Sequence, residues 1–167
     1  SGGGDEANND KLLAELRANP DRLTIATSGP GSGQEVMATL FAKSTGTKIT
    51  QVPYKGSVPG MVDLLGGRLS MMFDTIAQQT QNIAAGKVRA LAVTGPKRSP
   101  LLPTVPTAQE SGLKGFDVTI WYGVLAPRAT PAPVVERLNR EMVAVMASDD
   151  MKKRMEADGA EGGTTTP

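Results

Sequence analysis

The stretch LTIATSGPGSGQEVMATLF, residues 23–41, decides the fold. An apolar, strand-like run at 23–27 leads into a loop of glycine, serine and proline, and Ser32 then precedes Glu35 with the spacing of a helix-capping box. The first N–H groups of a helix lack internal partners and the helix dipole favours negative charge there. A strand, a loop of small residues and a helix start therefore form a cradle for an anion. The stretch predicts a helix over 33–44 and a ligand that carries a carboxylate or a phosphate.

The same alternation of strand and helix continues after this stretch. Short apolar runs are separated by helix starts and by glycines that stop the helices. Such a β-α-β succession predicts right-handed crossovers and a mostly parallel sheet with helices on both faces, which is the α/β class. The expected strands are 23–27, 47–54, 69–73 and 88–94; the expected helices begin at Asp10, Gly33, Ser57 and Asp74 and end near Arg17, Ser44, Gly66 and Gly86.

The composition of the sequence changes at Gly95, where prolines become frequent. A proline-rich stretch, 96–106, precedes a short helix at 107–111, a fifth strand at 117–125, a helix opened by Thr130-Pro131 and a last helix at 149–157. We expect three parts: a linker or tag-like start at 1–10, an α/β ligand-binding lobe at 11–116, and a crossover strand with C-terminal helices at 117–167.

The composition narrows the classes of function. The 167 residues include 18 Lys and Arg against 17 Asp and Glu, without a basic stripe, so nucleic acid is not expected as a partner. Histidine and cysteine are both absent, which excludes thiol chemistry, Ser-His catalysis and zinc sites built on either ligand. We expect no metal and no cofactor. No apolar run reaches the length of a membrane span, and no signal peptide is recognisable.

Several blocks of sequence, in this order, match one family. They are SGPGS (28–32), VPYKGS (52–57), DLLGG (63–67), MFD (72–74), GKVRALAV (86–93), KRSPLLPTVP (97–106), WYGVLAP (121–127) and Thr130-Pro131 with the helix behind it. Over residues 11–167 the chain resembles the extracytoplasmic solute-binding proteins of tripartite tricarboxylate transporters, the Bug or TctC-like family.

The resemblance implies a fold and a role. The fold would be one lobe of a type II periplasmic-binding-protein clamp, here the second lobe plus a C-terminal segment that returns to a first lobe, for which the chain has no counterpart before Asp10. The role would be capture of a small organic acid in the periplasm and its delivery to a membrane permease, without catalytic residues. Apolar surfaces at 117–146 would then lack a cover, and we expect a homodimer through them.

The candidate ligand residues follow expected strands at three points. Several polar residues also have a purely structural interpretation. Ser32 and Asp74 can be helix caps, Tyr54 can pack its ring at the sheet edge, and Lys55 and Lys97-Arg98 can be solvated charges. The candidates are Ser28, Gly29, Gly31, Ser32, Gly33, Tyr54, Gly56, Ser57, Asp74 and Thr75. Because parallel strands end at one edge, we expect Ser28, Gly31, Ser32, Tyr54, Gly56 and Asp74 to converge there on one cleft.

Two other classes of protein remain open from the residues alone. One is a small α/β enzyme that binds a phosphorylated or carboxylated substrate at the 28–33 loop, although no paired acid and base flank this loop. The other is the ligand-sensing domain of a transcription regulator. Turnover of a substrate would favour the first, and a DNA-binding region in the parent gene the second.

Overall fold

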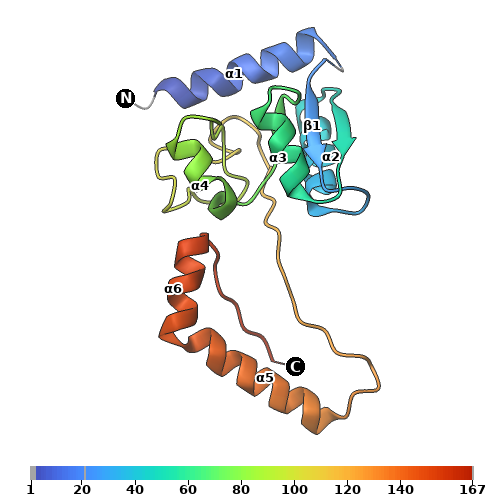
Figure 1. Ribbon diagram of the computed structural model, residues 1–167, viewed down its shortest axis with the longest axis vertical. Helices are drawn as coiled ribbons and strands as arrows, with labels where there is room; N and C mark the ends of the chain where they lie inside the picture. The colour runs from blue at the N-terminus through green and yellow to red at the C-terminus, as the bar shows by residue number, and fades with distance from the viewer. Residues whose placement is uncertain (1–2, 21, 167) are drawn as a thin grey trace. The chain divides into compact units, whose positions relative to one another are not determined.

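The computed structural model describes residues 3–20 and 22–166 (Figure 1). The chain divides into two compact units, Ser1–Ile120 and Trp121–Pro167, so the division falls four residues after the predicted boundary at 116. Each unit is described by itself below.

The first unit contains a parallel three-stranded sheet. Its strands are β1 (Thr24–Thr27), β2 (Thr50–Pro53) and β3 (Met71–Met72), in the order β2-β1-β3. In the centre of the sheet, Ala26 pairs with Val52 on one side and with Met72 on the other. The α/β class and the parallel sheet are confirmed, with β2 and β3 shorter than predicted.

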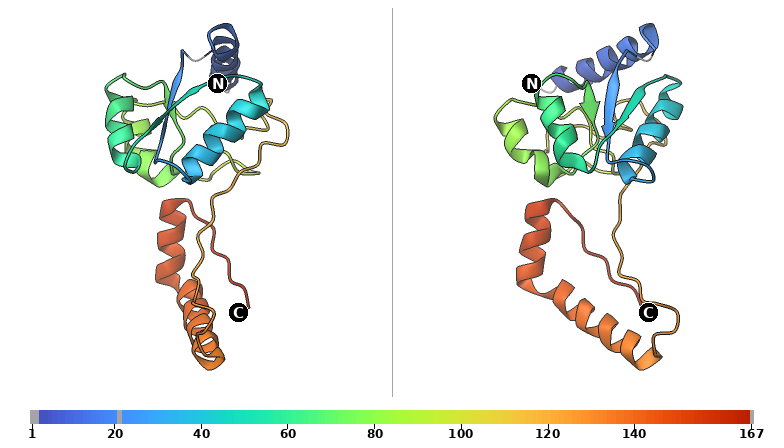
Figure 2. Two further views of the ribbon diagram at one scale, coloured as in Figure 1. Left: turned by 90° about the vertical axis from the view of Figure 1, so that its right-hand side faces the viewer. Right: turned by 45° about the vertical axis from the view of Figure 1, so that its right-hand side comes forward.

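Helices cover both faces of this sheet. The helix α2 (Gly33–Thr45) joins β1 to β2, and α3 (Ser57–Leu65) joins β2 to β3. The connection from β1 to β2 and the connection from β2 to β3 cross the sheet in opposite directions. Because such parallel crossovers are both right-handed, the two helices lie on opposite faces of the sheet, as Figure 2 shows. All three strands therefore end at one edge, where both helices begin.

The predicted start of α2 is confirmed in its main feature. Ser32 Oγ accepts from the amide of Glu35 at 3.2 Å, and Gly46 ends the helix with a left-handed φ of 64°. The Glu35 carboxylate, however, accepts from the amide of Gly31 rather than from that of Ser32. The start of α2 therefore differs from a capping box, because the Glu35 carboxylate binds the amide of the residue before the N-cap.

The core of the first unit gathers side chains from distant parts of the chain. Leu16, Phe41, Ala108 and Phe116 are buried together. The ring of Phe41 lies 6.0 Å from that of Phe73 and 6.4 Å from that of Phe116, both edge-on. Leu16 is fully buried, so the N-terminal helix is part of the fold.

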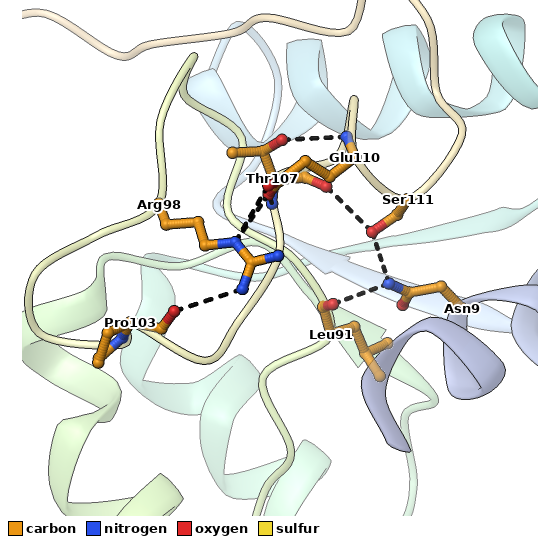
Figure 3. A network of polar contacts seen from close by, with 7 residues as sticks. All are labelled: Asn9, Leu91, Arg98, Pro103, Thr107, Glu110 and Ser111. Carbon is orange, nitrogen blue, oxygen red and sulfur yellow. Dashed lines mark hydrogen bonds and ion pairs between the residues drawn. The ribbon is translucent and has the colours of Figure 1, made fainter. Parts of the chain in front are cut away.

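The first helix is longer than predicted. It runs over Gly3–Ala18 (α1), so Asp10 lies inside it and does not cap it. Asn9, which was placed in the linker-like start, is buried, and its side-chain amide donates to Leu91 O at 2.9 Å and to Ser111 Oγ at 2.8 Å (Figure 3). These bonds anchor α1 to the segment 88–111.

Two predicted strands are wrong. In 88–94 only Val93 makes a bridge, to Thr107, and in 117–125 the amide of Val118 donates to Thr94 O as a single attachment. A strand exists only where a neighbour supplies a ladder of hydrogen bonds, and the described residues give these segments isolated bonds instead: Val93 bonds to Pro106 and Ala108, and Thr94 accepts from Val118. Apolar alternation was present, but the partner was not.

The predicted helix at 107–111 is a turn closed by side chains. Glu110 N donates to Thr107 Oγ1 at 3.0 Å, and Thr107 N donates to the Glu110 carboxylate at 2.7 Å. The same carboxylate accepts from Arg98 Nε at 2.9 Å, and Arg98 also donates to Pro103 O (Figure 3). Arg98 therefore fastens the proline-rich loop to this turn, which corrects its reading as a solvated charge.

The helix after β3 also starts differently from the prediction. It is α4 (Ile76–Ala84), and its N-cap residue is Thr75 rather than Asp74. Asp74 Oδ1 accepts from the amide of Thr75 at 2.9 Å, and Oδ2 accepts from the side-chain amide of Gln79. Asp74 thus ties down the turn before the helix.

The second unit consists of two helices and an extended tail. The helices are α5 (Ala132–Ala147) and α6 (Asp149–Asp158), as predicted, and Ser148 ends one and caps the other by accepting from Met151 N. The predicted apolar face of α5 is exposed at Val134, Leu138 and Val145. No helix among the described residues is both long and apolar enough to span a bilayer.

Candidate functional site

Three of the chain's turns meet at one buried side chain, Gln34, in the first turn of α2. Its Oε1 accepts from Ser28 Oγ, which directly follows β1. Its Nε2 donates to Phe73 O at 2.7 Å, directly after β3, and to Ser57 Oγ at 3.3 Å, at the start of α3. The carboxyl ends of β1 and β3 and the first turn of α3 are therefore bound to one amide.

Two of the candidates lie side by side at this edge of the sheet. Ser28 Oγ and Ser57 Oγ lie 3.5 Å apart, although 29 residues separate them in the sequence. Both side chains are half-buried. The carboxyl edge of an open α/β sheet is where ligands bind, so this pair of hydroxyls marks the candidate site.

The backbone amides of the 28–33 loop are used differently from the prediction. The amide of Gly31 donates to the Glu35 carboxylate at 2.6 Å, and that of Ser32 donates to Gly29 O at 3.2 Å. Of the predicted amides, that of Gly33 remains without a partner among the described residues, together with that of Gln34. The available donors at this loop are therefore the amides of Gly33, which was a candidate, and of Gln34, which was not.

The loop needs glycine at two positions. Gly29 and Gly31 have φ of 97° and 76°, which L side chains rarely adopt. Gly29 is also buried, and a Cβ there would lie 3.4 Å from Tyr54 O. At Gly33 a Cβ would lie 2.8 Å from Ile120 Cδ1, so the Ile120 side chain lies over the start of α2.

The start of α3 adds a second set of donors. Gly56 is the N-cap residue, with φ of 96°, and no side chain caps the helix. The amides of Ser57 and Val58 make no hydrogen bond in the described part of the chain, and a Cβ on Gly56 would meet nothing within 4 Å. Both helices thus present free backbone N–H groups at the same edge of the sheet, although Ser32 caps α2 at Glu35.

Tyr54 does not offer its hydroxyl to this site. The phenol donates to Asp63 Oδ2 at 2.7 Å, and Gly60 of α3 faces its ring. The hydrogen bond to the Asp63 carboxylate raises the pKa of Tyr54, and the same bond, with help from Arg68, lowers the pKa of Asp63. The hydroxyl of this candidate residue therefore already donates its hydrogen within the chain.

The remaining two candidates, Asp74 and Thr75, lie beside Phe73 but outside the Gln34 cluster. Both Asp74 oxygens accept bonds from its own turn, and Thr75 is exposed with no side-chain cap bond. Neither residue bonds to Ser28, Gln34 or Ser57 among the contacts of the described chain.

Gln34 was missed by sequence reasoning, although a signal was present. It shares the register of Met37, Ala38 and Phe41, which is the buried stripe of α2. A polar side chain at a core-facing position requires buried partners, which marks it for attention.

Two other kinds of site do not arise from the described residues. They contain no group of three or more Asp and Glu side chains arranged to hold a metal ion. A hollow of about 380 Å³ lies within the second unit, lined mainly by Met146, Met155 and other small or apolar groups of α5, α6 and the tail. It includes none of the predicted ligand residues.

Comparison with known sequences identifies the family. The family of tripartite tricarboxylate transporter receptors, TctC, matches residues 6–164. A UPF0065 protein encoded in the tcbD-tcbE intergenic region of Pseudomonas sp. strain P51 is 43% identical over 150 residues, which are 89% of this chain and 45% of that protein. The chain thus spans about half the length of such relatives.

Solved structures agree with this assignment. The periplasmic binding protein BugD is 41% identical, with a TM-score of 0.82 over 91% of this chain and 51% of that one. Rpa4515 of R. palustris, solved with adipate, is 37% identical, with a TM-score of 0.85 over 94% and 52%. MatC of Rhodopseudomonas palustris, solved with malate, is 32% identical, with a TM-score of 0.82 over 90% and 51%.

These likenesses decide between the open classes. The relatives are binding proteins and transport receptors, which sets aside the enzyme and the transcription-regulator domain. This chain belongs to the tripartite tricarboxylate transporter receptor family, TctC.

Proposed function

We propose that the chain forms part of an extracytoplasmic receptor that captures a small organic carboxylate for a tripartite tricarboxylate-type transporter. The observation that carries the proposal is the pair of helix starts, α2 and α3, which have free backbone N–H groups and are joined through Ser28, Gln34 and Ser57. Amides of Gly33, Gln34, Ser57 and Val58 supply donors for a carboxylate, and both helix dipoles favour its charge.

The relatives support the same ligand chemistry and the same compartment. Adipate and malate, found with two of the solved relatives, are both small dicarboxylates, and BugD is a periplasmic protein. The receptor would accordingly act in the periplasm and deliver its ligand to a membrane permease. Ligand contact at Ser28, Ser57, Gly33 and Gly56 belongs to this proposal.

A matched pair of variants tests the role of the helix start. Gly33→Pro removes one amide donor yet suits the first position of a helix, because Ser32 already has the extended ψ of 152° that a following proline requires. Gly33→Ala keeps the amide and adds the same first carbon. In the protein as its gene encodes it, calorimetry with adipate, malate and succinate should show Gly33→Pro about tenfold weaker than Gly33→Ala. Binding of no acid, or equal affinities of the two variants, would contradict the proposal.

Self-association is a further part of this proposal. Trp121, Tyr122 and Leu125 lie on an extended, exposed segment without a ladder partner in the described chain. Contiguous exposed apolar surface and unpaired extended backbone both favour pairing between chains. We therefore propose a homodimer of this chain through residues 117–146.

A further inference from the structure

The buried amide of Gln34 has one possible orientation. The residue is 8% exposed, and one of the two terminal atoms of its side chain lies 2.7 Å from Phe73 O. A backbone carbonyl can only accept a hydrogen bond, so the atom facing it is the NH₂ group. Oε1 of Gln34 consequently faces Ser28 Oγ.

This orientation determines where the hydroxyl hydrogen of Ser28 lies. An amide oxygen only accepts, so Ser28 donates its single hydrogen to Gln34. The Ser28 oxygen retains lone pairs and has no hydrogen left to give. Toward a ligand, Ser28 can act only as an acceptor.

Ser57 has the opposite polarity. The second hydrogen of Gln34 Nε2 points to Ser57 Oγ at 3.3 Å, which makes that oxygen an acceptor toward the amide. Its own hydrogen has only Ser28 Oγ within reach among the described residues, at 3.5 Å, which is long for an O–H···O bond. Toward a ligand, Ser57 can therefore act as a donor.

We propose that Gln34 is a positioning residue that fixes Ser28 as an acceptor and Ser57 as a donor, and thereby selects acids with a hydroxyl or ammonium group beside a carboxylate. The inference rests on the proposed function of the site. The carboxylate of such a ligand accepts from Ser57 and from the helix amides, and its neighbouring donor group contacts Ser28. The adjacent groups of a 2-substituted acid suit two serine oxygens 3.5 Å apart. An acid without the donor leaves the buried lone pair of Ser28 unpaired, which costs affinity.

Matched pairs of acids test this polarity by calorimetry on the protein as its gene encodes it. Malate and aspartate are each compared with succinate, and 2-hydroxyadipate with adipate. We expect the substituted acid to bind about tenfold more tightly in at least one pair. Ser28→Ala should bring that ratio close to one, because it removes the acceptor that distinguishes the two acids. Ser57→Ala should weaken both acids several-fold and preserve their ratio. Ser44→Ala, on the exposed side of α2, is the control.

Each outcome has one meaning. Binding of acids with a ratio near one in every pair, or a ratio that survives Ser28→Ala, overturns the assignment of polarity and leaves the proposed function standing. Absence of binding by every acid overturns the proposed function and this inference with it. A preference for malate alone or for aspartate alone supports the inference and tells the hydroxyl from the ammonium.

A second measurement is independent of ligand and of substitution. In the unliganded protein, the side-chain NH₂ protons of Gln34 should give two separate resonances that exchange slowly with solvent, because both hydrogens are bonded and buried. Fast exchange, at the rate of an exposed glutamine such as Gln78, overturns the fixed orientation.

Discussion

The hydroxyl of Tyr54 donates to the carboxylate of Asp63 at 2.7 Å, and Arg68 Nε donates to the other oxygen of the same carboxylate at 2.8 Å. Tyr54 follows β2, whereas Asp63 lies two turns into α3. The bond therefore connects the end of the strand to the following helix. The phenol donates its hydrogen to Asp63 and has no second hydrogen to donate to a ligand.

Tyr54→Phe should lower stability modestly and leave ligand affinity within about twofold. The substitution removes one hydrogen bond at a half-exposed position, and Asp63 keeps Arg68 as a partner. We expect a fall in melting temperature of about 2–4 °C. Calorimetry with the best acid of the panel checks the affinity; a tenfold loss would place the hydroxyl in the ligand site after all.

The same cluster predicts how stability depends on pH. Hydrogen bonds from Tyr54 and Arg68 hold the pKa of Asp63 below its ordinary value of 3.8, so between the two values the unfolded chain binds more protons than the folded one. The stabilisation is complete above about pH 3.8 and is lost as pH falls through the folded-state pKa. The melting-temperature difference between wild type and Asp63→Asn should therefore be constant from pH 5 to 7 and shrink in acid.

At the alkaline end the sign is reversed. The bond to Asp63 raises the pKa of Tyr54 above its ordinary value of 10.0, so its contribution is complete below pH 10 and is lost as pH rises through the folded-state pKa. Tyr54→Phe should remove this alkaline component. A component that persists in the variant would assign it to another group.

Gly33 and Ile120 should be energetically coupled. A Cβ at residue 33 would lie 2.8 Å from Ile120 Cδ1, so Gly33→Ala must displace that side chain. In an Ile120→Ala background the same change meets no obstacle and gains helix propensity, which is worth up to about 1 kcal/mol. A double-mutant cycle by urea unfolding should give a coupling of about 1 kcal/mol. Strictly additive effects would show that Ile120 does not lie over the helix start.

Asn9→Ala should be among the more damaging polar substitutions. Its buried amide satisfies Leu91 O and Ser111 Oγ, and removal leaves a carbonyl without a partner, at a cost of about 1–3 kcal/mol. Asn19→Ala is the matched control, because among the described residues the Asn19 side chain bonds only to the Glu15 side chain, and its loss should cost below about 0.5 kcal/mol. Equal losses in urea unfolding would contradict the role of Asn9 as the anchor of α1.

The sequence predicted those helices whose ends are set by residues at or next to the ends themselves. The start of α2 at Ser32, its stop at Gly46 and the opening of α3 after Gly56 were all readable, since caps and left-handed glycines act within a few residues. Segments 88–94 and 117–125 have strand-like composition, but whether they pair depends on distant residues. No local pattern contains that information.

The candidate site was predictable at the level of its place and less so in its details. Ser28 and Ser57 lie 3.5 Å apart at the edge where the parallel strands end. The partner of each loop amide could not be predicted from the sequence. The amide of Gly31 donates to the Glu35 carboxylate, and the amide of Ser32 donates to Gly29 O. The role of Gln34 was not predicted, because it depends on bonds to Ser57 and Phe73, which are distant in the sequence.

The last prediction concerns self-association through residues 117–146. Trp121 is 78% exposed and Leu125 is 89% exposed, on an extended segment, and Leu138 is exposed on α5. We expect the 167-residue chain to form a dimer at about 100 µM by light scattering, since apolar surface of this kind drives association. The fluorescence of Trp121, the only tryptophan, should shift to shorter wavelength as the concentration rises. Trp121→Ser with Leu138→Ser should yield a monomer, whereas Arg128→Ser, on the same exposed stretch, should not change the dimer. A monomer at every concentration would refute this, as would a dimer that survives the double substitution.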